Sequence, residues 1–275
     1  MTLQGFCVPL SPEGRASLSP MPPWHYVGDM LLVDFWADPD AVAAVLPPRL
    51  EPDAQDPGRC TAFFVAWQFA STQADEPLDP VRSQYHEFIL LVNATLGDQP
   101  VSSCPYIYVD SDVSMARGWI QGWPKKLGAV HTTRTFGLRS PAAPLLEPGG
   151  SFGGSLSVNG RRLAEATVSL EQPSEDPLFL GKRPIVNVRH FPQLAAAQQG
   201  RPAVHELVRS VLSGISRSEI WEGAATLRFH EAPDQELYAL RPQRVGRGYR
   251  YTTALTVDDL EIIETLSDQP DEVPA

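Results

Sequence analysis

The sequence predicts a mostly β fold of the α+β class, an antiparallel sheet closed or rolled around a core with a few packing helices. The chain has 27 prolines and 20 glycines in 275 residues, which divide it into short segments that suit strands joined by turns. No alternation of strands with helices is visible, so a parallel sheet is not expected. Asn159-Gly160 is a strong hairpin signal, because both residues can take a positive φ.

Strands are predicted where short apolar or β-branched runs lie between turn residues. Adjacent residues of each strand should face opposite sides of the sheet. In chain order the predicted strands are 30–36, 61–69, 85–95, 101–109, 129–138, 154–158, 162–170, 227–230 and 249–257.

Three helical segments are predicted between the strands. Asp38 can cap a short helix with Pro39 at its first position, ending before Pro47. Asp112 can cap a turn over 113–121, which Gly122 and Pro124 end. The segment 204–215 is predicted as an amphipathic helix, because its apolar residues fall on one helical stripe. That stripe is Leu207, Val208, Val211, Leu212 and Ile215.

The composition describes a single globular domain over residues 1–263, followed by an acidic tail over 264–275. A net charge of −11 argues against nucleic acid and anionic membranes as partners, since both need a basic face. No apolar stretch is long enough for a membrane span, and the first residues lack the pattern of a signal peptide. Cys7, Cys60 and Cys104 are predicted to be free thiols, which together with these features indicates a cytoplasmic protein.

The most informative segment is Gly118-Trp119-Ile120-Gln121-Gly122-Trp123-Pro124-Lys125-Lys126-Leu127-Gly128. Two adjacent lysines follow a Trp-Pro step, which suggests an amine held against apolar rings. Burial disfavours the charged ammonium, so the lysine pKa falls and a neutral amine can form a Schiff base with a ketone. In an extended segment Lys125 and Lys126 point to opposite faces, so burial should lower the pKa more than repulsion does. The alternative is that both lysines flank a turn in water.

This segment resembles the active site of the acetoacetate decarboxylase superfamily, a known example of a lysine activated by its surroundings. Weaker similarities lie at Pro23-Trp24-His25-Tyr26 and Trp221-Glu222-Gly223. The resemblance implies a cone-shaped β-barrel with Lys125 inside it as the nucleophile. It also implies no cofactor, and a homo-oligomer of four or more subunits. Trp123 and Lys126 flank Lys125 as candidate substrate-binding residues.

Other candidates follow from their position relative to Lys125. Gln121 lies four residues before it, on one face if the turn is helical, and its amide could orient a substrate oxygen. Tyr85 and Glu87 share one face of a strand, and a carboxyl group facing the interior could move protons. The alternatives are a solvated glutamine, and a structural ion pair of Glu87 with Arg82 or Arg117.

Arg82 could clamp a substrate carboxylate, although it could equally be a surface arginine. Tyr249 and Tyr251 share a face of the last strand, which the resemblance brings near the pocket. A phenol there could protonate an intermediate, Tyr251 being the first choice; the alternative is packing. The histidines show no metal-ligand spacing, so no metal is predicted, and no phosphate-binding or dinucleotide motif is present.

The chain departs from authentic decarboxylases at two positions. Gly118-Trp119 stands where the family pattern has Arg-Glu, and Gly28 aligns with an arginine that handles the substrate carboxylate. Relatives with a Trp-Ile-Gln-Gly-aromatic-Pro-Lys-Lys segment are more similar, and that branch is associated with aldolase-dehydratase chemistry on 2-oxo acids in natural-product pathways.

The resulting expectation is a cofactor-independent carbon–carbon lyase that forms a lysine Schiff base with a small ketone or 2-oxo acid and carries out aldol condensation with dehydration. The alternatives are decarboxylation of a β-keto acid, and a non-catalytic barrel that binds a small molecule.

Overall fold

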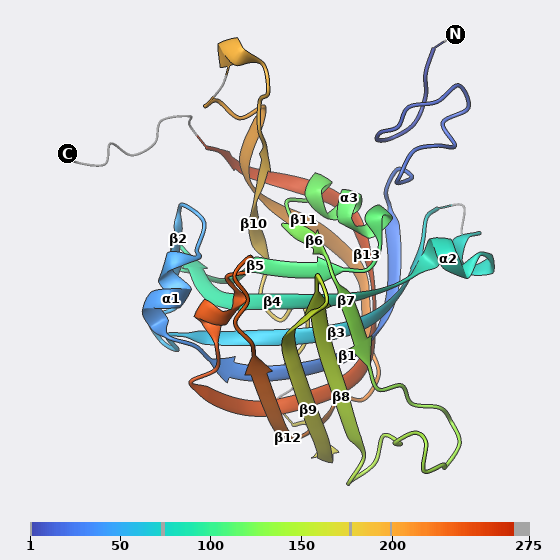
Figure 1. Ribbon diagram of the computed structural model, residues 1–275, viewed down its shortest axis with the longest axis vertical. Helices are drawn as coiled ribbons and strands as arrows, with labels where there is room; N and C mark the ends of the chain where they lie inside the picture. The colour runs from blue at the N-terminus through green and yellow to red at the C-terminus, as the bar shows by residue number, and fades with distance from the viewer. Residues whose placement is uncertain (1, 73–74, 176–177, 199, 267–275) are drawn as a thin grey trace.

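A computed structural model describes residues 2–72, 75–175, 178–198 and 200–266 of the chain, and shows mostly strands with few helices (Figure 1). One sheet has the strand order β6-β5-β4-β3-β1-β13-β12-β9-β8-β7, with β2 paired to β4 and the β10–β11 hairpin paired to β13. The strands are β1 Trp24–Trp36, β2 Leu50–Pro52, β3 Arg59–Ala70, β4 Gln84–Leu96, β5 Gln99–Val109, β6 Lys125–Leu127, β7 Ala129–Thr132, β8 Ser151–Val158, β9 Arg161–Pro173, β10 Val186–Phe191, β11 Val204–Arg217, β12 Trp221–Phe229 and β13 Arg244–Thr265. The predicted antiparallel sheet is thus confirmed, with β5 and β6 as a parallel pair.

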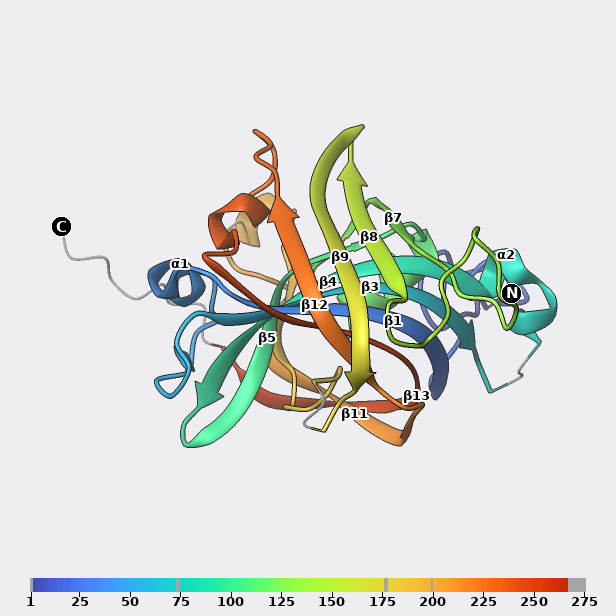
Figure 2. The same cartoon turned by 90° about the horizontal axis from the view of Figure 1, so that it is seen from below.

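The sheet curls so that its two ends meet. The terminal strands β6 and β7 are consecutive in the chain and are separated by Gly128 alone, whose N–H donates to the Val109 carbonyl of β5 (2.8 Å). Strand β7 also contacts β3 and β4 from across the roll. Figure 2 shows β8, β9 and β12 standing across β1, β3 and β4. No ladder closes the path, but the curled sheet is compatible with the cone-shaped barrel that the resemblance implies.

Alternation along the central strands builds two separate cores. In β1, Leu31, Val33 and Phe35 pack on the side of β8, β9 and β12, whereas Met30 and Leu32 face the other side. The same alternation divides β3 and β4, since successive side chains point to opposite faces. The second core includes Phe63, Val65, Trp67, Tyr85, Ile89 and Tyr251 and faces α3. A cavity lies on this second side.

Two of the predicted helices are present. Helix α1 (Pro39–Ala44) begins where expected, with the Asp38 side chain accepting the N–H of Asp40. Helix α3 (Asp112–Ile120) matches the predicted turn, but its cap is Ser111 and not Asp112. The remaining helical segments are short: α2 Pro80–Ser83, η1 Glu76–Leu78, η2 Ala196–Gln198 and η3 Leu237–Leu240.

The predicted helix over 204–215 is wrong, because this segment is the strand β11. It pairs with β10 and with the end of β13. The ladder to β13 is irregular between Leu207 and Val208, between Val211 and Leu212, and between Ser213 and Ser216. These bulges interrupt the alternation that would identify a strand, so the apolar spacing resembles that of a helix. The strand predicted over 129–138 is also shorter, ending at Thr132.

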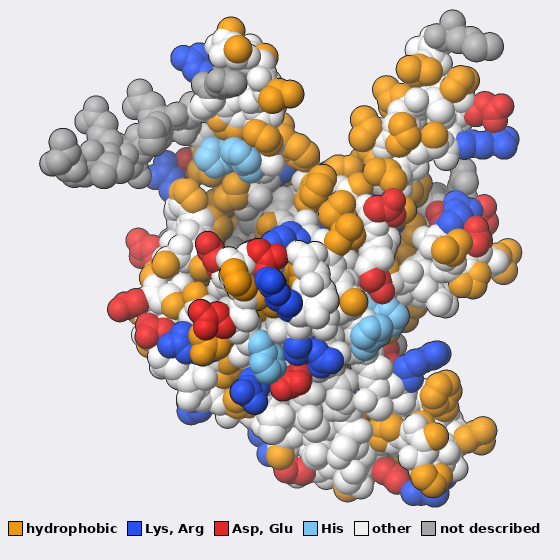
Figure 3. Space-filling model, in the orientation of Figure 1, with side chains coloured by type: hydrophobic (Ala, Val, Ile, Leu, Met, Phe, Trp, Pro, Cys, Tyr) orange, Lys and Arg blue, Asp and Glu red, His pale blue; other side chains and the backbone are white. Residues whose placement is uncertain are grey.

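Two segments project from the body of the molecule. Figure 3 shows them at the top, the N-terminal segment at one side and the end of the β10–β11 hairpin at the other. Both carry exposed apolar side chains: Leu3, Val8, Leu10 and Met21 on the first, and Leu194 on the second. Strand β13 continues to Thr265, so the predicted tail begins inside it, and residues 267–275 lie outside the described residues. No helix in the described ranges is long and apolar enough to span a membrane.

Candidate active site

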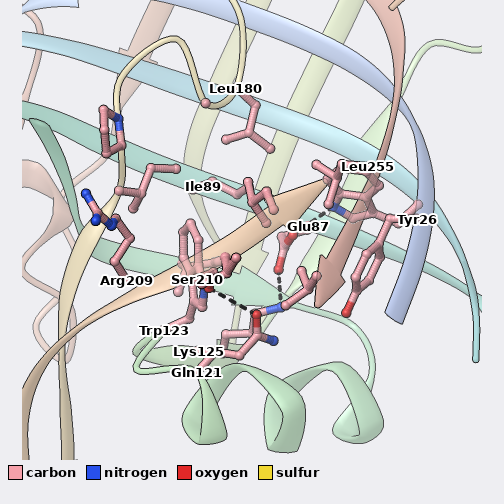
Figure 4. Close-up of a pocket in the computed structure, with 18 of the residues that line it drawn as sticks. Tyr26, Glu87, Ile89, Gln121, Trp123, Lys125, Leu180, Arg209, Ser210 and Leu255 are labelled. Carbon is pink, nitrogen blue, oxygen red and sulfur yellow. Dashed lines mark hydrogen bonds and ion pairs between the residues drawn. The ribbon is translucent and has the colours of Figure 1, made fainter. Parts of the chain in front are cut away.

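A cavity of about 410 Å³ lies on the second core side, between α3, β4 and β11. Lys125, Glu87 and Gln121 lie at one end, and Arg209 lies at the other (Figure 4). Glu261 also lines the cavity and forms an ion pair with Arg209 at 2.6 Å. Between the two ends the walls are mostly apolar: Trp67, Ile89, Ile107, Trp123, Leu180, Ile185, Val211, Leu212, Leu255 and Val257.

Lys125 lies in the cavity wall, and only 8% of its surface is exposed. Its Nζ lies 2.6 Å from Oε1 of Glu87 and donates to the Ser114 hydroxyl at 3.0 Å. The ammonium also lies 5.7 Å from the centre of the Tyr85 ring. The amine is therefore inside the molecule, in contact with a carboxylate and near an aromatic ring.

The local sequence explains how Lys125 is held. Gly122 has a φ of +80° and ends helix α3, so the chain turns back toward β5. A side chain at Gly118 would come within 2.3 Å of Lys125 Cδ, so the glycine makes room for the lysine methylenes. The Trp119 indole donates to the Lys125 carbonyl at 2.9 Å. Trp119 itself is 46% exposed and is not a cavity wall, unlike Trp123.

Burial is the main cause of a lowered pKa for Lys125. Desolvation disfavours the charged form, and the Arg117 guanidinium lowers the pKa further, whereas Glu87 opposes both. Lys126 is not among the causes. The two lysines face opposite sides of β6, as predicted: Lys126 is exposed and donates to Gln235 at 2.8 Å. Burial therefore outweighs repulsion between the lysines, and the cation that contributes is Arg117.

Glu87 is held at both carboxylate oxygens. Oε1 contacts Lys125, and Oε2 accepts a hydrogen bond from the Trp67 indole N–H at 2.7 Å. The alternative ion pairs with Arg82 or Arg117 do not form. Tyr85 shares this face and lines the cavity, and burial raises its pKa well above the usual value. The carboxylate is thus placed to exchange protons with groups bound at Lys125.

Gln121 and Trp123 also line the cavity beside Lys125. The Gln121 amide donates to the Arg117 carbonyl at 3.1 Å, and its oxygen accepts from the Ser210 hydroxyl of β11 at 3.3 Å (Figure 4). The glutamine is therefore buried, not solvated. Its position is fixed by α3 on one side and β11 on the other.

Several residues predicted for the site lie elsewhere. Arg82 is on the exposed helix α2 near Asp75 (3.9 Å), away from the cavity, and Lys126 points to the opposite side of β6. Tyr249 and Tyr251 are buried in β13, but neither lines the cavity. The Tyr251 hydroxyl accepts the N–H of Leu180 at 2.8 Å and so anchors a segment that does line it. Both tyrosines carry a raised pKa because of burial.

The sequence interpretation missed Trp67, Tyr26 and Ser114, and it considered Arg117 only as a structural partner. The Arg117 guanidinium is buried, stacks on Phe69 at 3.7 Å, and has no hydrogen-bond partner at Nε or Nη1. Tyr26 and Trp67 come from β1 and β3 and reach the site through strand register, whereas Ser114 and Arg117 come from α3, which lies shortly before Lys125 in the chain. No group of three or more His, Cys, Asp or Glu side chains in the described part of the chain could hold a metal ion.

Comparison with known proteins gives consistent results. Residues 7–266 match the sequence profile of acetoacetate decarboxylase. The enduracididine biosynthesis enzyme MppR, solved with the condensation product of pyruvate and imidazole 4-carboxaldehyde, is 37% identical with a TM-score of 0.89, covering 98% of this chain and 99% of that one. The same enzyme was also solved with pyruvate.

Two more distant structures are similar over nearly their whole length. An acetoacetate decarboxylase-like enzyme from Sphingomonas wittichii is 29% identical with a TM-score of 0.87, covering 96% of this chain and 100% of that one. Acetoacetate decarboxylase from Legionella pneumophila is 18% identical with a TM-score of 0.73, covering 96% and 98%, and shares the fold. No curated protein sequence matches the chain.

Proposed function

Since the chain belongs to the acetoacetate decarboxylase family, we propose that it is a cofactor-independent lyase that joins a 2-oxo acid to a second carbonyl compound through a Schiff base on Lys125. The observation that carries this proposal is a buried amine with a lowered pKa, 2.6 Å from a carboxylate, in the wall of a cavity. MppR, which was solved with pyruvate and with a pyruvate condensation product, supports the choice of substrate class.

The first step is addition of the neutral Lys125 amine to the ketone carbon of the 2-oxo acid. Water leaves, and a protonated imine (iminium) remains. This iminium withdraws electrons from the neighbouring carbon, so that a C–H bond there becomes acidic. Glu87 is the base that we assign to this proton, because its carboxylate already lies at Nζ.

The resulting enamine attacks the carbon of an aldehyde and forms the new carbon–carbon bond. The aldehyde oxygen takes a proton and becomes a hydroxyl group. A second proton is then lost from the carbon beside the iminium, and the hydroxyl takes up another proton and leaves as water, so that a C=C bond forms. Hydrolysis of the imine releases the unsaturated 2-oxo acid and frees Lys125. Tyr26 and Tyr85 line the cavity and are our candidates for protonating that oxygen. Proton transfer by Tyr251 remains a prediction, and its hydrogen bond to Leu180 offers a structural role instead.

Substrate orientation is assigned to Arg117 and Gln121. The Arg117 guanidinium does not line the cavity, but it lies against the rings of Tyr26 and Tyr85, which do line it, and has no hydrogen-bond partner at Nε or Nη1. It supplies positive charge behind these rings, which favours a substrate with a carboxylate. The Gln121 amide, fixed by two hydrogen bonds, can hold a carboxylate or carbinolamine oxygen without adding charge. Arg82 does not line the cavity and lies near Asp75, so the carboxylate clamp predicted from the sequence is not assigned to it.

The cavity has room for the second substrate. Its volume of about 410 Å³ lies in the range of roughly 300–1,000 Å³ found for pockets that bind drug-sized ligands. A three-carbon acid alone would leave much of this cavity unfilled. The walls beyond Lys125 include Ile89, Leu212 and Val257. We therefore expect the aldehyde to carry an apolar body.

Product analysis tests the proposal. The protein is incubated with pyruvate and benzaldehyde, and in parallel with acetoacetate alone. The proposal expects the unsaturated 2-oxo acid that follows loss of water, identified by mass, and no carbon dioxide from acetoacetate. Carbon dioxide without condensation would indicate the decarboxylase alternative, and neither product with any of several aldehydes would favour a binding protein.

Variants of the adjacent lysines make a matched pair for this assay. Lys125→Ala should abolish the condensation product, because the nucleophile is lost. Lys126→Ala should retain it, because that side chain is exposed and faces away from the cavity. Equal loss in both variants would contradict the assignment of Lys125.

A further inference from the structure

Trp67 lines the cavity, but no catalytic motif and no step of the proposed reaction gives it a role. It lies on β3 with 6% of its surface exposed, and its indole N–H donates to Oε2 of Glu87 at 2.7 Å. The other oxygen of the same carboxylate lies 2.6 Å from Lys125 Nζ. The carboxylate is therefore bridged between a neutral donor and the reactive amine.

The strand register makes this contact possible. Trp67 pairs with Tyr85, and Val65 pairs with Glu87, so that Trp67 and Glu87 are diagonal neighbours on one face of the β3–β4 ladder. A diagonal neighbour is within reach of a large aromatic side chain. The indole N–H is a donor only and does not titrate near neutral pH, so it adds no charge and cannot replace Glu87 as a base.

Gly28 provides the space for the indole. It faces Trp67 across the β1–β3 ladder, and a side chain at this position would come within 2.3 Å of Cε3 and 2.5 Å of Cζ3 of the ring. The ring therefore lies directly against the glycine backbone. Tyr26 contacts it edge-on, with ring centres 5.8 Å apart. Any larger residue at position 28 would displace the indole from Glu87.

We infer that Trp67 is a positioning residue that fixes Oε2 of Glu87, leaving Oε1 to take the proton from the carbon beside the Lys125 iminium, and that Gly28 is required for this arrangement. The inference rests on the proposed function. In the step concerned, the C–H electron pair forms the C=C bond of the enamine, the iminium π electrons move to Nζ, and the proton goes to Oε1. The attack of Lys125 on the ketone does not need this bond.

These two steps can be measured separately with pyruvate. Reduction with borohydride traps the Schiff base and reports its formation as a gain in intact mass. Exchange of the pyruvate methyl protons with deuterated solvent, followed by NMR, reports proton removal after the Schiff base has formed. A positioning role changes the second measurement and not the first, whereas a purely structural role changes both.

Trp67→Phe keeps the aromatic ring and removes the N–H. We expect the amount of trapped adduct to match the parent protein, while the maximal exchange rate falls about tenfold to a hundredfold, as for loss of a hydrogen bond to a charged group. The pyruvate concentration for half-maximal exchange should stay the same. Gly28→Ala keeps the tryptophan at position 67 but moves its ring. This variant should therefore also form the adduct normally and exchange protons more slowly.

Trp36→Phe is the matched control. The Trp36 indole donates to the Asp56 carboxylate at 2.7 Å, the same kind of bond, but neither residue lines the cavity. This variant should retain both adduct and exchange. Exchange in Trp67→Phe within twofold of the parent protein, or a parallel loss of adduct and exchange in Trp67→Phe and Gly28→Ala, would overturn the inference. No adduct in the parent protein would instead refute the proposed function on which it rests.

Discussion

At the scale of single residues, the proposed chemistry depends on one amine whose surroundings lower its pKa. Burial of Lys125 and the Arg117 guanidinium lower its pKa, and the Glu87 carboxylate opposes them. The net direction is down from the ordinary value of 10.5. The carboxylate therefore reduces the effect of burial while remaining in place for proton transfer.

The pH dependence of Schiff-base formation follows from this direction. The neutral amine is the nucleophile, so the rate of adduct formation should rise with pH and level off below pH 10.5, the ordinary lysine pKa. Arg117→Met removes a cation that disfavours the ammonium form, so the curve should move to higher pH. Arg82→Met is the control, since Arg82 lies on the surface. A curve unchanged in Arg117→Met would contradict the role of Arg117.

Gly118 gives a second test at this scale. Its added side chain would lie 2.3 Å from Lys125 Cδ, so Gly118→Ala should displace the lysine and lower the rate of adduct formation, with a loss of stability of about 1–3 kcal/mol from overpacking. Gly137→Ala is a suitable control because nothing lies within 4 Å of its added carbon. Mass spectrometry of the trapped adduct and urea denaturation measure the two effects. An unaffected Gly118→Ala variant would show that the lysine does not pack there.

At the scale of elements, what could be predicted depended on how regular each element is. The Asn159-Gly160 hairpin was predicted and is confirmed, with both residues at positive φ, because its signal is local. The same holds for α1, whose cap and proline are adjacent. Strand β11 was mistaken for a helix because its bulges place apolar residues at helical spacing. The contacts of Glu87 with Trp67 could not be predicted, since they depend on the register of β3 against β4.

The assignment of segment 204–217 as strand β11, and not as a helix, can be tested by truncating two of its large apolar side chains to alanine and measuring stability. Leu207 is fully buried, whereas Ile215 is 44% exposed, although both lie on the helical stripe that the sequence suggested. Leu207→Ala should reduce the unfolding free energy by about 2–5 kcal/mol, and Ile215→Ala by about 0.5 kcal/mol or less. Urea denaturation measures both. Similar large losses would instead fit a helix that buries the whole stripe.

At the scale of the whole molecule, the two faces of one curled sheet have different roles: one face holds a core that stabilises the fold, and the other holds the cavity. Residues on one side of β4 fill the core under β8, β9 and β12, and their immediate neighbours face the cavity. The general fold class was predictable from the sequence, because prolines and glycines mark the turns and the short apolar or β-branched runs between them mark the strands. By contrast, only the assembled fold shows that β6 and β7, which join at Gly128, are the two terminal strands of the sheet, and this places Lys125 where the ends of the sheet meet.

Ile89 and Leu90 test this separation, since they are adjacent and fully or almost fully buried on opposite sides. Leu90→Ala should lower the unfolding free energy by roughly 2–5 kcal/mol without changing the KM for an apolar aldehyde. Ile89→Ala should raise that KM, because Ile89 lines the cavity. Steady-state kinetics and urea denaturation separate the effects. A raised KM in Leu90→Ala alone would contradict the two-sided arrangement.

The most direct test of Lys125 as the Schiff-base nucleophile is to trap the pyruvate adduct with borohydride and locate it by peptide mass mapping. We predict a single adduct on Lys125, present in Lys126→Ala and absent in Lys125→Ala. An adduct on Lys126, or none at all with pyruvate and other small 2-oxo acids and ketones, would contradict this prediction.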